Sequence, residues 1–203
     1  MKMQNKKNIW IFMLLLGSLF GISGCTTQEK QGADIGARMS DSEYTSVIDQ
    51  NTRHFVKYEG FYQKFEIYAT FVNSNVQSAM LQRLSDTKLW GPAEAQKERE
   101  RMFQENTTQT KFVISFFVPS TRLNDLHKGA SIWEIYLESN GQKYRGKAMR
   151  RNGKLEDIQS IIPYHNRWSI PYDITFDTPL SGVESGSAKF IITSSQGAAE
   201  LAF

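Results

Sequence analysis

Cysteine is nearly absent from this 203-residue sequence, which contains only Cys25. A single cysteine cannot form an intramolecular disulfide, and it cannot supply the several thiolates of a structural zinc site. Histidine is almost as scarce. The three histidines, His54, His127 and His165, lack the i,i+4 spacing of helical metal ligands. The sequence therefore predicts neither a metal centre nor a bound cofactor.

Long hydrophobic runs are absent except for one near the N-terminus. Residues 9–22 are mostly apolar and follow three lysines, but the run is shorter than the roughly 20 residues that span a bilayer. A basic start and a short apolar stretch are typical of a secretory signal peptide. The stretch ends in Ile22-Ser23-Gly24-Cys25, which resembles a lipobox. We expect residues 1–24 to be a lipoprotein signal peptide and Cys25 to receive a diacylglycerol and palmitate-type acyl chains. An ordinarily cleaved signal or an uncleaved anchor is the alternative.

Cleavage of residues 1–24 would remove the chain's excess of positive charge. The sequence has 24 Lys and Arg against 21 Asp and Glu. Three of the basic residues and none of the acidic ones fall in residues 1–24, so 21 of each remain. A neutral mature chain gives no electrostatic reason to bind nucleic acid, and none is expected as a partner.

The next segment contains few large apolar residues. Residues 25–39 are rich in Gln, Gly, Thr and Ala, which is typical of a flexible tether, and residues 40–203 are expected to form one domain. Thr26 follows the predicted lipid site. Lipoproteins without Asp at this position resemble those sent to the outer membrane of bacteria with two membranes. In a host with one membrane, the outer leaflet of the plasma membrane takes its place.

Helices are expected in the first half of the domain. Ser40 and Glu43 fit a capping box, which predicts a helix from Asp41 to about His54. Helical spacing recurs at Val76, Ala79, Met80 and Leu84. A further helix should begin at Pro92, and its run from Glu94 to Glu105 is charged enough to be solvated.

Three stretches alternate between apolar and polar residues, as strands do. They are Phe61 to Val72, Phe112 to Val118, and Trp168 to Phe176. Phe61 lies on the apolar side of the first stretch, and Trp168 on that of the third. Pro171 in the third stretch predicts an edge strand, because proline has no N–H to donate to a ladder.

Two hairpins are expected. Asn140-Gly141 is the strongest short-range hairpin signal, and it sets the pairs Glu138–Lys143, Leu137–Tyr144, Tyr136–Arg145, Ile135–Gly146, Glu134–Lys147 and Trp133–Ala148. A second turn centred on Gln196-Gly197 places Phe190 opposite Phe203, Ile192 opposite Leu201 and Thr193 opposite Glu200.

These elements predict a mainly β fold. Several short antiparallel strands favour a β-sandwich of immunoglobulin-like or transthyretin-like architecture, with a short N-terminal helix and a helical insertion at about residues 73–106. A half-open barrel is the alternative.

Part of the chain resembles a group of uncharacterised bacterial envelope lipoproteins. The resemblance covers roughly residues 52–203, and residues 112–176 best. It is carried by Phe116-Phe117-Val118-Pro119, Arg122-Leu123-Asn124-Asp125-Leu126, Ser131-Ile132-Trp133, Ile162-Pro163-Tyr164 and Trp168 to Tyr172. It implies an envelope location and a β-rich fold, and it supplies no catalytic residue.

Two stretches are candidates for binding. Arg150, Arg151 and Lys154 form a basic patch that could meet anionic lipid head groups or other envelope polyanions. Tyr164, Arg167 and Trp168 are of the types that dominate protein interfaces. The alternatives are a partly neutralised hairpin face for the first stretch and a core role for Trp168 in the second.

Catalytic chemistry has little support in the sequence. Asp125 and His127, with Ser120 or Ser131, could form a Ser/His/Asp set by composition, but no G-x-S-x-G elbow is present. The Arg122-to-Asp125 loop could grip an anion, or it could plug one end of the fold.

We therefore expect a non-enzymatic envelope lipoprotein with a structural or assembly role. The lipid on Cys25 would hold it to the membrane, and an envelope protein of unknown identity would be its partner. A module that binds a lipid or a small apolar ligand is the alternative, and an envelope serine hydrolase is a minor one.

Overall fold

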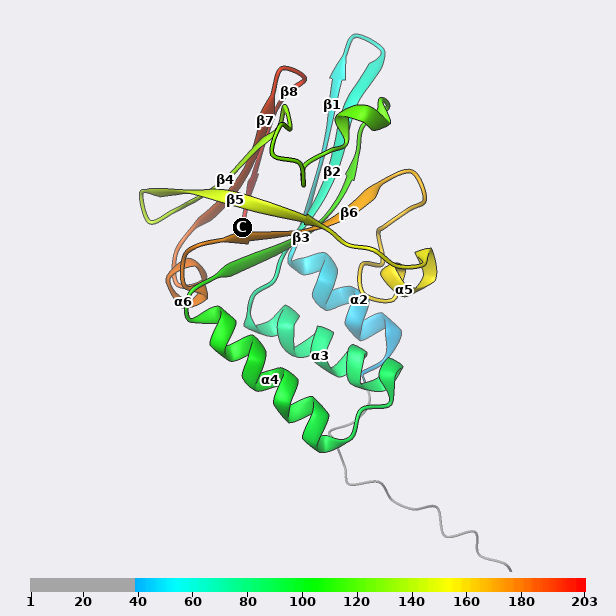
Figure 1. The fold of residues 1–203 in the computed structure, drawn as a ribbon, viewed down its shortest axis with the longest axis vertical. Coiled ribbons are helices and arrows are strands. Elements are labelled where there is room, and N and C mark those ends of the chain that lie inside the picture. The colour runs from blue at the N-terminus through cyan, green and yellow to red at the C-terminus, as the bar shows by residue number, and fades with distance from the viewer. Residues whose placement is uncertain (1–38) are drawn as a thin grey trace, which may run out of the picture. The chain divides into compact units, whose positions relative to one another are not determined.

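The computed structural model describes residues 39–203. The eight strands are all antiparallel and form one sheet in the order β1-β2-β3-β6-β5-β4-β7-β8 (Figure 1). The strands are β1 (Thr52–Glu59), β2 (Tyr62–Phe71), β3 (Thr110–Phe117), β4 (Glu134–Ser139), β5 (Gln142–Arg150), β6 (Ile170–Phe176), β7 (Ala188–Ser194) and β8 (Gly197–Ala202). The helices are α2 (Asp41–Gln50), α3 (Ser74–Lys88), α4 (Pro92–Asn106), α5 (Leu155–Gln159) and α6 (Leu180–Glu184), with a 3-10 turn at Thr121–Leu123.

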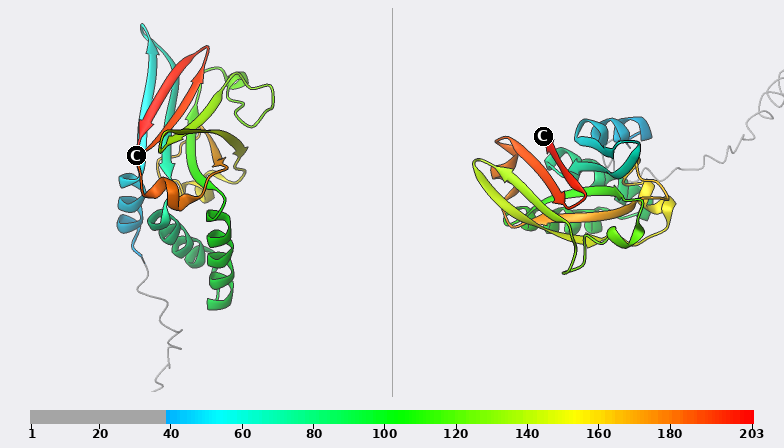
Figure 2. Two further views of the ribbon diagram at one scale, coloured as in Figure 1. Left: turned by 90° about the vertical axis from the view of Figure 1, so that its left-hand side faces the viewer. Right: turned by 90° about the horizontal axis from the view of Figure 1, so that it is seen from above.

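The sheet curls into a nearly closed barrel (Figure 2). Its two edge strands, β1 and β8, lie beside each other. Side chains bridge this seam: Arg53 Nε donates to the carbonyl of Ala202 at 2.9 Å, and its guanidinium lies 5.1 Å from the centre of the Phe203 ring. A mainly β fold is thus present. The expected two-sheet sandwich is not confirmed, because the strands form one continuous, barrel-like sheet that agrees better with the half-open barrel.

Aromatic rings fill the barrel interior. Inward positions of four strands, β2, β3, β6 and β7, carry phenylalanines that solvent does not reach: Phe65, Phe112, Phe116, Phe176 and Phe190. Their rings pack edge to face and at tilts with centroids 5.2–6.1 Å apart, a favoured geometry for aromatic pairs. The interior is therefore a packed core.

A second core lies on the outside of the sheet, under the helices. Val113 of β3 faces outward and packs with Tyr44, Ile48, Val76 and Ile162, which come from α2, α3 and the segment after α5. The Tyr44 hydroxyl donates to the carbonyl of Ile161 at 2.7 Å, and burial raises the pKa of that hydroxyl. These contacts fix the position of the segment that follows α5.

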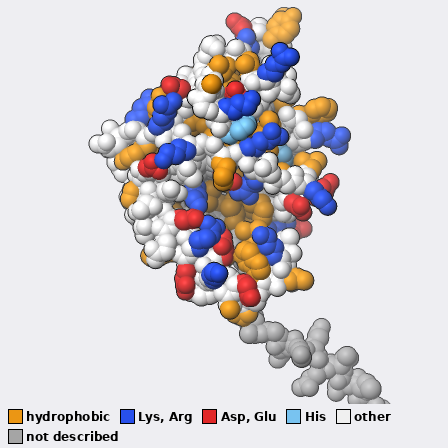
Figure 3. Space-filling view, in the orientation of Figure 1, with side chains coloured by type: hydrophobic (Ala, Val, Ile, Leu, Met, Phe, Trp, Pro, Cys, Tyr) orange, Lys and Arg blue, Asp and Glu red, His pale blue; other side chains and the backbone are white. Residues whose placement is uncertain are grey.

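The predicted helices are confirmed with one change. The capping box of α2 is present, and α3 and α4 lie between β2 and β3 as expected. The charged α4 buries only Ala95, and Figure 3 shows charges of both signs interspersed over that side of the domain. However, α2 ends at Gln50 instead of about His54. Strand β1 was not predicted from the sequence, and its position at the seam leaves it without a clear alternation of buried residues.

The predicted strand registers agree with the structure to different extents in the two hairpins. In β4–β5 the pairs Glu138–Lys143, Leu137–Tyr144 and Tyr136–Arg145 are confirmed, with left-handed Asn140 and Gly141 in the turn. Farther along, β5 leaves β4 to pair with β6, so the predicted ladder pairs at Ile135, Glu134 and Trp133 do not form.

The β7–β8 register differs from the prediction by two residues. Phe190 pairs with Leu201, Ile192 with Ala199 and Thr193 with Ala198. The turn is therefore Ser195-Gln196, and Gly197 begins β8. A shift of two residues leaves every side chain on its predicted face.

The prediction that β6 is an edge strand is wrong, because β6 lies between β3 and β5. The Pro171 carbonyl accepts from the Arg151 N–H at 2.9 Å. In an antiparallel strand the backbone N and O of one residue point to the same neighbouring strand. The Pro171 nitrogen, which has no hydrogen, therefore faces the end of β5, where the β5–β6 ladder stops. Proline is tolerated there without a central hydrogen bond being lost.

Among residues 39–203, no helix has the length and apolarity needed to cross a bilayer.

Candidate functional site: an arginine groove

The two stretches predicted to bind lie next to each other in the structure. The end of β5 runs antiparallel to the start of β6, with Arg150 opposite Tyr172. The chain then passes through Asn152-Gly153 into α5 and returns through residues 161–169. Residues that are separated by more than ten positions in the sequence therefore share one surface.

These segments enclose a shallow groove of about 280 Å³. We call it the arginine groove, and its polar lining consists of Arg150, Arg151, Asn152, His165 and Arg167. Leu155, Ile158 and Pro171 are among its apolar lining residues. A groove with an apolar floor and several cationic groups suits an anionic ligand or an acidic segment.

The arginines differ in how far they are neutralised. Arg151 forms a two-pronged pair with Asp173, with Nη2–Oδ1 at 2.5 Å and Nε–Oδ2 at 3.3 Å. Arg150 and Arg167 are exposed, and no carboxylate of the described residues pairs with either. Arg151 is therefore neutralised by Asp173, while Arg150 and Arg167 remain available to a partner.

Lys154 lies at the margin of this surface. It is exposed and occupies the position before α5, where its carbonyl accepts from the Ile158 N–H at 3.0 Å. It adds positive charge beside the groove without lining it.

Trp168 is displayed beside the groove by a polar turn. The Asn166 Oδ1 accepts from the backbone N–H groups of Trp168 and Ser169 at 2.9 and 3.1 Å. The indole is 73% exposed, so the alternative that placed it in the core is wrong. The strand begins at Ile170, two residues after Trp168, and its alternation does not extend back to the indole. An ordered, exposed Trp next to Arg167 is typical of an interface hot spot.

Tyr164 does not belong to the exposed surface. Its ring stacks on Tyr68 at 5.1 Å, and Tyr68 stacks on His54 at 3.9 Å. Its hydroxyl contacts Thr70 Oγ1 at 2.5 Å, and burial raises the pKa of that hydroxyl. Tyr164 therefore anchors the loop that carries Arg167 and Trp168.

The groove also contains a buried histidine that was not assigned to any site from the sequence. His165 is 4% exposed, and its Nδ1 lies 2.8 Å from Ser115 Oγ. Burial lowers the pKa of the His165 imidazole. Sequence reasoning could not pair these residues, which are 50 positions apart and meet only because the segment after α5 folds onto β3.

This Ser–His contact lacks the features of a nucleophilic site. Ser115 is 1% exposed, so a substrate cannot reach its hydroxyl. No carboxylate of the described residues contacts the His165 ring to orient it.

The predicted Ser/His/Asp set is not assembled either. Ser131 Oγ donates directly to Asp125 Oδ1 at 2.8 Å, and His127 lies outside this contact. The preceding loop plugs the barrel end: Asn124 Nδ2 donates to Phe116 O at 2.8 Å, and Trp133 Nε1 donates to Leu123 O at 2.6 Å. The Tyr172 hydroxyl donates to Asn124 at 2.9 Å, and burial raises its pKa to about 12. These contacts favour the structural reading of the loop.

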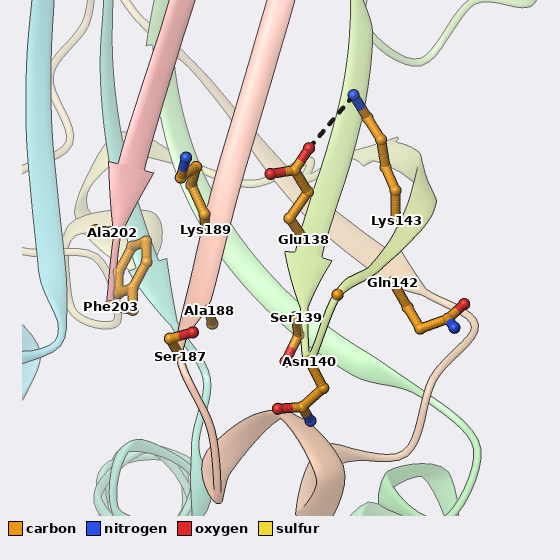
Figure 4. Close-up of a pocket in the computed structure, with 11 residues that line it drawn as sticks. Glu138, Ser139, Asn140, Gln142, Lys143, Ser187, Ala188, Lys189, Ala202 and Phe203 are labelled. Atoms are coloured by element: carbon orange, nitrogen blue, oxygen red, sulfur yellow. Dashed lines mark ion pairs between the residues drawn. The ribbon is translucent and has the colours of Figure 1, made fainter.

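A second depression of about 350 Å³ lies beside the β4–β5 turn, and the sequence analysis did not predict it (Figure 4). Its lining includes Lys143, Lys189 and Ser139. Both lysines are already paired, with Glu138 at 3.6 Å and Glu200 at 2.9 Å. The buried Ser139 Oγ has no hydrogen-bond partner among the described residues. The depression offers no free cation, so the arginine groove is the stronger candidate.

Cys25, the predicted lipid site, lies outside the described residues. Within residues 39–203, no group of three or more His, Cys, Asp or Glu side chains could hold a metal ion.

No protein-family model, no curated protein and no solved structure matches this chain. Its fold and surface alone define its class: a mainly β, barrel-like domain with a cationic groove on its outer side.

Proposed function

We propose that this chain is a lipid-anchored envelope protein whose β domain is a non-catalytic binding module. In this proposal Cys25 carries the lipid, and the arginine groove receives an acidic segment of a protein partner. The outer membrane is the proposed location in a host with two membranes.

The proposed address rests on the N-terminal sequence. Three lysines, a short apolar run and Ile22-Ser23-Gly24-Cys25 follow one another in the order that lipoprotein export requires. Two or more acyl chains on one residue hold a protein at a membrane stably, because each buried methylene contributes about 0.8 kcal/mol.

The observation that carries the binding proposal is the pair of unneutralised arginines in one groove. Arg150 and Arg167 are exposed and lack carboxylate partners in the described part of the chain, and Trp168 stands beside them at 73% exposure. Guanidinium groups bind carboxylates through paired hydrogen bonds, and an adjacent Trp supplies apolar contact area. Arg, Trp and a partly apolar floor together suit an acidic protein segment.

Two observations favour this role over the alternatives. The buried Ser115–His165 contact has neither access nor an orienting carboxylate, so it gives the hydrolase hypothesis little support. The barrel interior is filled by phenylalanine rings, so the apolar-ligand hypothesis has no comparable observation behind it.

The test is crosslinking in intact cells, followed by purification from membranes, of the parent and of the double variant Arg150→Glu/Arg167→Glu. We expect recovery of a stoichiometric protein partner to fall at least about tenfold, because like charges facing each other cost several kcal/mol and about 1.4 kcal/mol corresponds to tenfold. Mass spectrometry of the crosslinked species measures the loss.

The matched control is Lys97→Glu/Lys128→Glu, which makes the same charge change at two exposed lysines outside the groove. Both variants should unfold at the temperature of the parent. Recovery of the partner with the groove variant, or no stoichiometric partner with the parent, contradicts the proposal.

A further inference from the structure

Three aromatic side chains project from the turn that joins β1 to β2. Tyr58 is 57% exposed, Phe61 102% and Tyr62 80%. They lie within five residues of one another. Within residues 39–203, no other stretch of this length contains more than one large exposed hydrophobic side chain. We call these three residues the aromatic tip.

The aromatic tip is an ordered part of the sheet. Glu59 pairs with Tyr62 across the turn, and Gly60 takes a left-handed φ of +58°. The Glu59 carboxylate lies 2.7 Å from Lys64 Nζ, which ties the two strands together just below the turn. The rings are therefore presented at a fixed place.

The side-chain types of the aromatic tip are those that prefer the interface of a membrane. Phe61 at the apex has no polar atom to satisfy, and it is flanked by two tyrosines. Neither tyrosine hydroxyl has a hydrogen-bond partner among the described residues. Tyr rings prefer the boundary between acyl chains and head groups, with the ring in the apolar layer and the hydroxyl in the polar one.

The charges near the tip suit an anionic surface. Residues 57–64 contain Lys57 and Lys64 against the single carboxylate of Glu59, which leaves one positive charge. Lysines beside an inserted apolar group reach the phosphate level of the bilayer with their ammonium groups.

The position of the tip favours a bilayer over a folded protein. The β1–β2 turn lies at one end of the domain and the α3–α4 turn at the other, and hydrophobic side chains stand at the end of the hairpin (Figures 1 and 3). A stable protein interface buries about 800 Å² on each partner, which is more than three side chains at a convex apex present. A bilayer accepts a small, convex apolar apex.

We propose that the aromatic tip inserts into the interface of an anionic lipid bilayer. This contact is separate from the arginine groove, and its evidence does not depend on the lipid at Cys25.

The test is photolabelling of the full chain in vesicles of phosphatidylethanolamine and phosphatidylglycerol, with a phospholipid that carries a diazirine in its acyl chain. Mass spectrometry should find label in residues 57–64 and much less at Phe103 and Trp168, which are also exposed. The variant Tyr58→Ser/Phe61→Ser/Tyr62→Ser should lose the label in residues 57–64. These side chains are exposed, so the variant should fold as the parent does.

The matched control, Phe103→Ser, removes one exposed ring from α4 and should leave the label at the tip unchanged. The proposal is overturned if residues 57–64 take up no more label than Phe103 and Trp168, or if the triple variant keeps its label. Crosslinks from the tip to a second copy of the chain in place of lipid also overturn it.

Discussion

His165 is a titratable side chain in an environment that opposes its charged form. It is 4% exposed, its Nδ1 lies 2.8 Å from Ser115 Oγ, and burial lowers its pKa. When the folded-state pKa of a histidine lies below its unfolded value, the unfolded chain binds more protons at acidic pH. The stabilising effect is therefore present above the unfolded value near 6.5 and is lost as the pH falls below it.

We expect the free energy of unfolding to fall between pH 7 and pH 5, and His165→Gln to flatten this dependence. One proton can contribute a slope of at most about 1.4 kcal/mol per pH unit. Urea unfolding at several pH values measures the slope.

The control is His127→Gln, which removes an exposed histidine. Equal slopes for the parent and His165→Gln would show that the protonation of His165 is not linked to folding.

Individual side chains also show where sequence reasoning stops. Alternation placed Phe61 and Trp168 on the apolar sides of their stretches, yet both are exposed. Each residue continues the apolar side of a strand's alternation in the sequence. In the structure, however, Phe61 precedes Tyr62, the first residue of β2, and Trp168 precedes Ile170, the first residue of β6. A periodic pattern identifies which face a side chain takes within a strand, but it does not say where the strand stops. These two misplaced residues belong to the two proposed contact surfaces.

The two hairpins explain why one register was predictable and the other was not. Asn140 and Gly141 both take left-handed conformations, which the two-residue turn between twisted strands requires. At Gln196-Gly197 only Gly197 has a positive φ, +122°. A lone glycine can serve as a turn residue or as the first residue of a strand, so its presence does not fix the register.

Gly141 and Gly182 allow the cost of backbone strain to be measured without a change in packing, because neither has a neighbouring atom where a Cβ would lie. A Cβ added at Gly141 or at Gly182 meets no atom within 4 Å, but only Gly141 has a positive φ, +73°. We expect Gly141→Ala to destabilise the protein by about 1–2 kcal/mol, the cost of a left-handed L-residue. Gly182→Ala, inside α6, should stabilise it by about 0.5–1 kcal/mol.

Urea unfolding of the two variants measures both effects. Identical stabilities for the two alanine variants would contradict this interpretation of the turn.

The arrangement of the whole domain was the least predictable level. The local sequence identified all of the described strands except β1, both long helices and part of one register. It did not reveal that β6 lies between β3 and β5, because the pairing of β6 with β3 joins segments more than 50 residues apart. Long-range pairing also builds the arginine groove, whose two halves were predicted separately as a basic patch and an aromatic cluster. The chemistry of the site could thus be read from residue types, while its assembly required the fold.

The domain presents two separate contact surfaces, the arginine groove on its side and the aromatic tip at its end. The proposed function places this domain at a membrane of the cell envelope, and that location depends on Cys25.

The intact mass of the protein isolated from membranes tests this location most directly. The proposal predicts a chain that begins at Cys25 and carries a diacylglycerol, and a Cys25→Ser variant that lacks this added mass and is no longer held at the membrane. A chain with an unmodified Cys25, or with residues 1–24 still attached, would contradict it.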